Sequence, residues 1–115
     1  LAVFTPFKNI IRPFLKKPGQ GPSQKVMDEG FFKCRFLVTG ENNTKKTYVM
    51  SGQGDPGYKI TSMFVCESAL SLLGDASNLP GGQKYGGILT VSSGLGDVLI
   101  SRLQKAGISF ASGKK

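Results

Sequence analysis

The chain has 115 residues and a formal net charge of +8, from 15 lysines and arginines against seven acidic residues. This length suits one domain with a modest core and is too short for two ordinary domains. The sequence contains no histidine, which excludes the His-dependent nucleophile pairs, and no run of about 18 apolar residues that could cross a membrane. We therefore expect neither an independent hydrolase nor a metalloenzyme.

Residues 1–23 combine apolar residues at helical spacing with basic residues on a second face. The apolar positions follow intervals of three and four from Phe4 to Leu15, which predicts a short amphipathic helix that Pro13 bends or ends. Such a helix binds an anionic surface, or it packs onto its own domain. The candidate membrane-facing residues are Phe4, Phe7, Lys8, Ile11, Arg12, Phe14, Lys16 and Lys17. Residues 17–23 are rich in proline and glycine and predict a linker.

A β-hairpin is the clearest element in the pattern. Apolar side chains alternate from Phe32 to Val38, which predicts a half-buried strand over residues 31–39. Residues 40–43 predict a turn, and residues 44–51 return as the partner strand. Cys34 and Cys66 each lie in an apolar stretch and are expected to be small buried side chains, with a disulfide between them left open.

Gly52, Gly54 and Gly57 have the spacing of a dinucleotide-binding loop, G-x-G-x-x-G, ahead of a helix. In such a loop the backbone approaches a pyrophosphate that rests on the helix N-terminus. The strand before this loop is half polar, whereas the first strand of a nucleotide-binding unit is buried on both faces. The residues after Leu73 have the composition of a loop and supply no second parallel strand. We interpret the motif as an ordinary strand-to-helix turn and predict no cofactor-binding residue in this chain.

The helix predicted over residues 60–73 is apolar on most sides, and Glu67, Ser71 and Asp75 are expected to form its narrow solvent-facing stripe. A helix of this kind packs across a sheet and also against a further element, which this chain need not contain.

The last part of the chain predicts an extended segment over residues 87–91, a helix capped by Ser92 or Ser93, and a closing strand over residues 108–111. Gly107 is expected to end the helix. The residues of its predicted inner face are Leu95, Val98, Leu99, Leu103 and Ala106. The predicted fold class is α+β, with a mainly antiparallel or mixed sheet and helices on one face.

The order of these pieces resembles the C-terminal end of saccharopine dehydrogenase-like oxidoreductases. The resemblance covers about residues 30–111 and rests on four segments: residues 54–61 with the long helix that follows them, residues 79–82, residues 86–90 and residues 103–110. Two positions depart from the usual pattern, because Ile60 stands where a small residue is common and Val91 where a proline is common.

The resemblance implies a larger, two-domain parent whose N-terminal Rossmann domain binds NAD(P) and is absent here. Residues 24–115 are then the C-terminal α/β portion of the second, substrate or dimerisation domain. This portion shapes a substrate cleft or a subunit contact, and the chain alone is not expected to be catalytic. Tyr58 and Thr61 are the candidate substrate-facing residues, with packing and capping at the helix start as the alternative. The expected partner is the missing Rossmann portion, and a second copy of the chain is left open.

An alternative function of another class is a membrane or lipid-droplet surface module that acts through residues 1–23 on anionic lipid. Nucleic acid is not an expected partner, because the basic residues do not cluster beside the aromatic side chains of Phe32 and Phe36. We expect an intracellular protein, which associates with a membrane or lipid droplet if this alternative holds.

Overall fold

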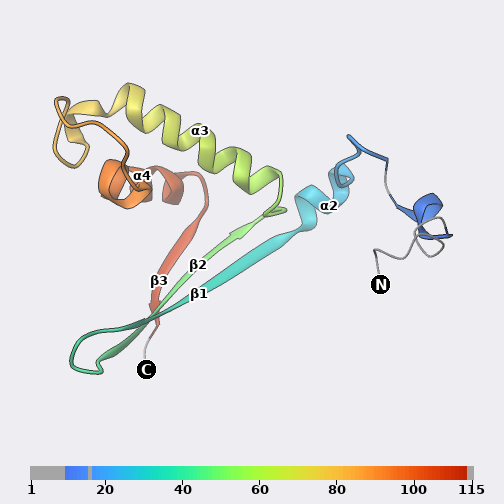
Figure 1. The fold of residues 1–115 in the computed structure, drawn as a ribbon, viewed down its shortest axis with the longest axis horizontal. Coiled ribbons are helices and arrows are strands. Elements are labelled where there is room, and N and C mark those ends of the chain that lie inside the picture. Colours follow the sequence, from blue (N-terminus) through green and yellow to red (C-terminus); the bar gives the residue numbers. More distant parts are fainter. Residues whose placement is uncertain (1–9, 16, 114–115) are drawn as a thin grey trace.

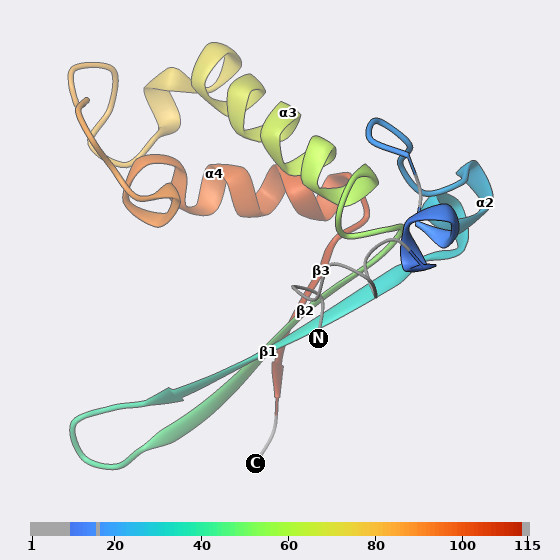
Figure 2. The same cartoon turned by 45° about the vertical axis from the view of Figure 1, so that its right-hand side comes forward.

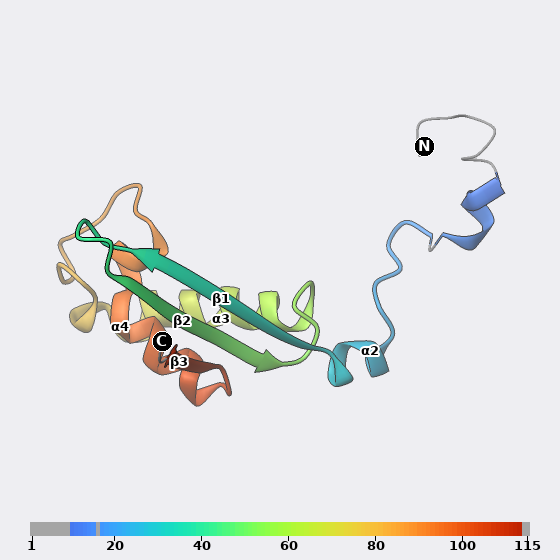
Figure 3. The same cartoon turned by 90° about the horizontal axis from the view of Figure 1, so that it is seen from below.

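The computed structural model describes residues 10–15 and 17–113, which form a three-stranded antiparallel sheet with two long helices on one face (Figures 1 and 3). The strands are β1 (Phe31–Thr39), β2 (Lys45–Gln53) and β3 (Ser109–Gly113), in the spatial order β1-β2-β3. The long helices are α3 (Lys59–Gly74) and α4 (Val91–Lys105), and the short elements are η1 (Arg12–Phe14), α2 (Gln24–Glu29) and η2 (Ala76–Asn78). The predicted α+β class is confirmed.

The predicted hairpin is confirmed by the pairing of β1 and β2, which runs from Phe31 opposite Gln53 to Thr39 opposite Lys45. The connection is closed by a hydrogen bond from the Gly40 N–H to the Thr44 carbonyl at 2.9 Å. Of the predicted inner side chains of β1, Phe32 is partly buried, whereas Cys34, Phe36 and Val38 are exposed. The prediction of a half-buried strand is therefore wrong beyond Phe32, because the helices do not cover the rest of β1. The turn end of the hairpin diverges from α3 and α4 (Figure 2).

The core lies between the sheet and the two long helices. It consists of five buried apolar residues, Ile60, Leu95, Leu99, Leu103 and Ile108. The rings of Phe32 on β1 and Phe64 on α3 meet edge to face beside this cluster, with their centroids 6.3 Å apart. The predicted inner face of α4 is confirmed at its three buried leucines, whereas Ala106 at its end is exposed.

The start of α4 differs from the prediction, whereas its end agrees with it. Thr90 and Ser93 form a reciprocal capping box, in which the Thr90 Oγ1 accepts from the Ser93 N–H and the Ser93 Oγ accepts from the Thr90 N–H. This cap draws Val91 into the first turn of the helix, so the extended segment predicted over residues 87–91 is wrong. Gly107, at a φ of 97°, ends the helix as predicted.

Other differences from the predictions lie before β1 and at the two cysteines. Helix α2 was not predicted, although Ser23 caps it by accepting a hydrogen bond from the Val26 N–H. Cys34 and Cys66 are exposed free thiols, so their predicted burial is wrong. Of the candidate membrane-facing residues, Phe4, Phe7, Lys8 and Lys16 lie outside the described part of the chain. The backbone is extended after η1 at Leu15, in agreement with the break predicted at Pro13.

Candidate functional site

The loop that leads into α3 is a candidate site because it carries the glycine motif together with Tyr58 and Thr61. Gly54 is buried and has a φ of 121°, a conformation that favours glycine. Its N–H donates to the Gly30 carbonyl at 2.5 Å, and the next N–H, of Asp55, donates to the Met27 carbonyl at 2.9 Å. These two bonds fix the loop against the C-terminal end of α2.

Asp55 organises the N-terminus of α3. Its Oδ2 accepts from the Tyr58 N–H at 2.7 Å, and its carbonyl accepts from the Ile60 N–H at 3.0 Å. A carboxylate at this end of a helix is stabilised by the helix dipole. Asp55 thus closes the turn before α3 with its own carboxylate and places a negative charge beside the glycine motif, which disfavours a phosphate there. The geometry supports the interpretation of the glycine motif as a strand-to-helix turn.

Tyr58 and Thr61 lie together in the first turn of α3. The Thr61 hydroxyl donates to the Pro56 carbonyl at 2.6 Å, which is a contact that stabilises the helix start. The Tyr58 side chain is half exposed and faces the backbone of Gly21 in the segment before α2. Both residues are accessible, and their substrate-facing role stays a prediction.

An ion pair joins α2 to the start of α3. The Lys59 ammonium donates to the Asp28 Oδ1, and the Gln24 side-chain amide donates to the Asp28 Oδ2 at 3.0 Å. The hydrogen bond from Lys59, and after it the one from Gln24, lowers the pKa of Asp28 below its ordinary value of 3.8. Both charged side chains are about half exposed, so the pair orients α2 more than it stabilises the fold.

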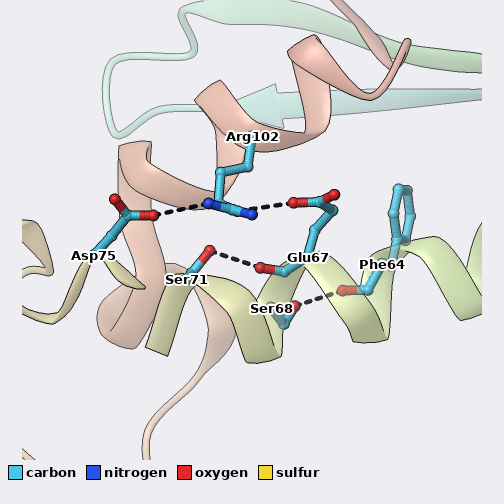
Figure 4. A network of polar contacts seen from close by, with 6 residues as sticks. All are labelled: Phe64, Glu67, Ser68, Ser71, Asp75 and Arg102. Carbon is cyan, nitrogen blue, oxygen red and sulfur yellow. Dashed lines mark hydrogen bonds and ion pairs between the residues drawn. The ribbon is translucent and has the colours of Figure 1, made fainter. Parts of the chain in front are cut away.

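A second polar group joins α3 to α4 at the other end of the helix pair (Figure 4). The Arg102 guanidinium donates from Nε to the Glu67 Oε2 at 2.8 Å and from Nη1 to the Asp75 Oδ2 at 3.0 Å. Ser71, which is fully buried, donates from its hydroxyl to the Glu67 carbonyl at 2.8 Å. The bond to Glu67 is the main cause that raises the pKa of Arg102, which therefore stays charged.

The predicted solvent-facing stripe of α3 is therefore wrong, because Glu67, Ser71 and Asp75 lie against α4. Arg102 supplies the countercharge that makes burial of these groups tolerable. The signal in the sequence was the spacing of four residues between the three polar positions, with an arginine on the next helix.

The opposite side of α3 carries an uncharged row of exposed residues, Val65, Ala69, Leu72 and Leu73, here called the outer stripe. These positions follow helical spacing and share one face. Leu72 also lines a shallow groove with Leu79, Tyr85 and Leu89 from the segment before α4 and with Val91 from its first turn. The sequence predicted an additional packing surface on α3, and the outer stripe is the surface left open in the described chain.

Within the described residues, no group of three or more His, Cys, Asp or Glu side chains could hold a metal ion. In the same part of the chain, every helix is too short or too polar to cross a membrane.

The chain is similar to mycobacterial proteins named as trans-acting enoyl reductases. A protein of Mycobacterium tuberculosis strain H37Rv, named as a candidate trans-acting enoyl reductase, is 32% identical over 103 residues, which cover 90% of this chain and 24% of that protein. A trans-acting enoyl reductase of Mycobacterium ulcerans is 32% identical over 92 residues, covering 80% of this chain and 21% of that protein. One of Mycobacterium bovis strain BCG is 28% identical over 101 residues, covering 88% and 23%.

This chain spans about a quarter of the length of these curated relatives. No protein-family model matches it, and no solved structure matches it. The relatives are reductases by name, which agrees in part with the expectation that a dinucleotide cofactor belongs to a larger parent.

The comparisons correct the predicted family and function. The resemblance to saccharopine dehydrogenase-like oxidoreductases is wrong, because the relatives are named for the reduction of an enoyl group. The alternative function, a membrane or lipid-droplet surface module, is wrong for the same reason, because the relatives are named as reductases. Ile11, Arg12, Phe14 and Lys17 remain as described residues of the N-terminal segment, and no contact with lipid is shown for them.

Proposed function

We propose that this chain is a segment of a trans-acting enoyl reductase. The observation that carries the proposal is the 32% identity to the Mycobacterium tuberculosis protein over 90% of this chain. The matched residues are 24% of that protein, so the complete active site requires polypeptide beyond this chain.

Reduction of an enoyl group adds a hydride and a proton across a carbon–carbon double bond. We propose NAD(P)H as the hydride source, held by the part of the parent that lies outside this chain. A reductase that acts in trans receives the enoyl group from a separate protein, and that carrier is the substrate partner we propose. The free thiols of Cys34 and Cys66 suit the reducing interior of the cell, where NAD(P)H is held.

Within this parent, residues 24–115 belong to a second domain that shapes the substrate side of the active site, and residues 1–23 connect to it. The antiparallel sheet supports this division, because a dinucleotide-binding domain is built on parallel strands joined by helices. The carboxylate of Asp55 in the turn before α3 supports it as well, because a negative charge beside the glycine motif disfavours a phosphate. Tyr58 and Thr61 are the exposed polar residues of this region that we propose face the substrate.

The test uses the longer polypeptide encoded around this chain, purified beside the chain itself. Oxidation of NADPH is followed with a 2-enoyl thioester, both free and attached to a carrier protein. We expect the parent to oxidise NADPH in the presence of the thioester and the 115-residue chain neither to bind NADPH nor to react. A parent that leaves both thioesters unreduced contradicts the proposal, and so does an isolated chain that oxidises NADPH.

The substrate-facing residues are tested in the same assay. Tyr58→Phe and Thr61→Val in the parent are expected to raise the KM for the enoyl thioester and to leave the KM for NADPH unchanged. Tyr48→Phe is the control, because this tyrosine is also exposed but lies on β2, away from the start of α3. Equal effects of Tyr58→Phe and Tyr48→Phe would remove Tyr58 from the substrate surface.

A further inference from the structure

We propose that the outer stripe of α3 is the surface on which the remaining polypeptide of the parent reductase docks. This inference rests on the proposed function only in taking the chain to be part of a longer protein. It assigns an interaction surface and its occupant, which are separate from the chemistry of the reduction.

The distribution of polarity around α3 is the first step. In a helix on the surface of a complete domain, the polar side faces water and the apolar side faces the core. The C-terminal half of α3 has the reverse arrangement, because Glu67 and Ser71 lie against α4 while Leu72 and Leu73 are 58% and 82% exposed. A continuous exposed apolar surface rimmed by polar residues marks an interaction site.

The exposure of the apolar side chains on this surface is the second step. Val65, Leu72 and Leu73 on α3 are 64%, 58% and 82% exposed. In the groove beside Leu72, the side chains of Tyr85 and Val91 are 53% and 63% exposed. A single exposed leucine is ordinary, whereas a group of apolar side chains exposed on neighbouring segments marks an interaction site.

The chemistry and length of the occupant are the third step. The outer stripe carries no charge although the chain has a net charge of +8, so it fits an apolar protein surface rather than an acidic partner or an anionic ligand. The relatives are long enough to supply such a surface, because about three quarters of their residues lie outside the matched segment. The groove beside Leu72 extends the same surface toward Tyr85 and Val91.

Cys66 provides a reporter, because it is an exposed free thiol on α3 next to the outer stripe. With Cys34→Ser in place and any other cysteine of the parent replaced by serine, the labelling rate of Cys66 by a maleimide is measured in the 115-residue chain and in the parent. We expect labelling at least about tenfold slower in the parent, because the docked polypeptide covers the thiol. Equal labelling rates overturn the proposal, as does a gene that encodes no polypeptide beyond these residues.

Leu73→Glu tests the contact itself, because its exposed position lets the charge enter without disturbing the core. The remainder of the parent, expressed without residues 1–115, is titrated with the chain in size-exclusion chromatography with light scattering. We expect a one-to-one complex that Leu73→Glu abolishes and that Leu37→Glu preserves. Leu37 is the matched control, since it is 78% exposed on β1. Circular dichroism confirms that each variant keeps its helices.

The remaining outcomes are equally decisive. Self-association of the chain that Leu73→Glu abolishes would assign the stripe to a second copy and overturn the proposal, as would a complex that Leu73→Glu leaves intact. Loss of the complex on Leu73→Glu in a parent that reduces no enoyl thioester would support the docking surface while contradicting the proposed function. If Leu73→Glu leaves the labelling of Cys66 as slow as before in a parent that reduces the enoyl thioester, the result would support the proposed function and contradict the docking surface.

Discussion

The two halves of α3 have similar apolar content and pack in opposite ways. In the N-terminal half, Ile60 is 2% exposed and Phe64 packs beside it against the sheet. In the C-terminal half, the side that faces α4 carries Glu67 and Ser71, and the leucines face water. The first half is oriented by apolar packing and the second by hydrogen bonds to one arginine.

The difference shows that apolar content alone does not orient a helix. An exposed leucine is common in folded proteins, whereas a carboxylate placed away from water requires a charged partner. Arg102 supplies that partner to two carboxylates on one side of α3, and this fixes the rotation of its C-terminal half. The apolar residues on the other side of α3 then have no packing partner within the described part of the chain, and a surface from outside it can cover them.

Ile60→Ala is expected to have the largest effect on the packed half. Removal of a buried isoleucine side chain costs about 2–5 kcal/mol, from lost burial and from the cavity that remains. The free energy of unfolding, measured by urea denaturation, is the observable. Leu73→Ala in the other half is the control and is expected to change stability by less than about 0.5 kcal/mol. Similar losses at both positions would show that the two halves do not differ.

Gly54→Ala is expected to have the next largest effect, because the loop that seats Ile60 depends on this residue. At a φ of 121°, an added Cβ would lie 3.2 Å from the Ile60 Cδ1. We expect a loss of about 1–3 kcal/mol in the free energy of unfolding. Gly74→Ala is the matched control, since a Cβ there meets nothing within 4 Å. A loss at Gly74 as large as that at Gly54 would exclude the steric explanation.

Arg102→Met is expected to lower the thermal midpoint by less than Ile60→Ala does, because the group is partly exposed. The substitution keeps an apolar stem against α3 but leaves Glu67 and Asp75 without their countercharge. Glu67→Gln, added to Arg102→Met, should recover part of the loss, and circular dichroism melting measures all variants. An unchanged midpoint in Arg102→Met would mean that the polar network does not orient the C-terminal half.

The predictable part of the fold was the part that local patterns specify. Alternation from Phe32 to Val38 defined β1, and Gly107 defined the end of α4. The segment before α4 was mispredicted because Val91 favours a strand by composition, whereas Thr90, as the N-cap, starts the helix two residues before the start that a cap at Ser92 implies. Capping was recognised in the sequence but was assigned to the wrong residue.

The candidate site was less predictable, because it depends on which elements meet. A helical pattern shows that Glu67 and Asp75 share a side of α3, but not whether that side faces water or Arg102 on α4. The exposure of Cys66 follows from the same rotation of the helix. The contact of Asp55 could have been inferred, since an aspartate in a turn commonly accepts a hydrogen bond from a backbone N–H a few residues further along.

The smallest predicted effect concerns the ion pair that fixes α2 to the N-terminal half of α3. The pKa of Asp28 is lowered in the folded state, mainly by Lys59, so its stabilisation is complete above the ordinary value of 3.8 and is lost as the pH falls through the lowered value. Lys59→Met should therefore reduce the difference in urea midpoint between neutral pH and about pH 3, with little change in the fold. Lys46→Met in β2 is the control. If both variants reduce the difference in urea midpoint equally, the cause is the change in net charge. The ion pair between α2 and the N-terminal half of α3 then contributes nothing specific to stability.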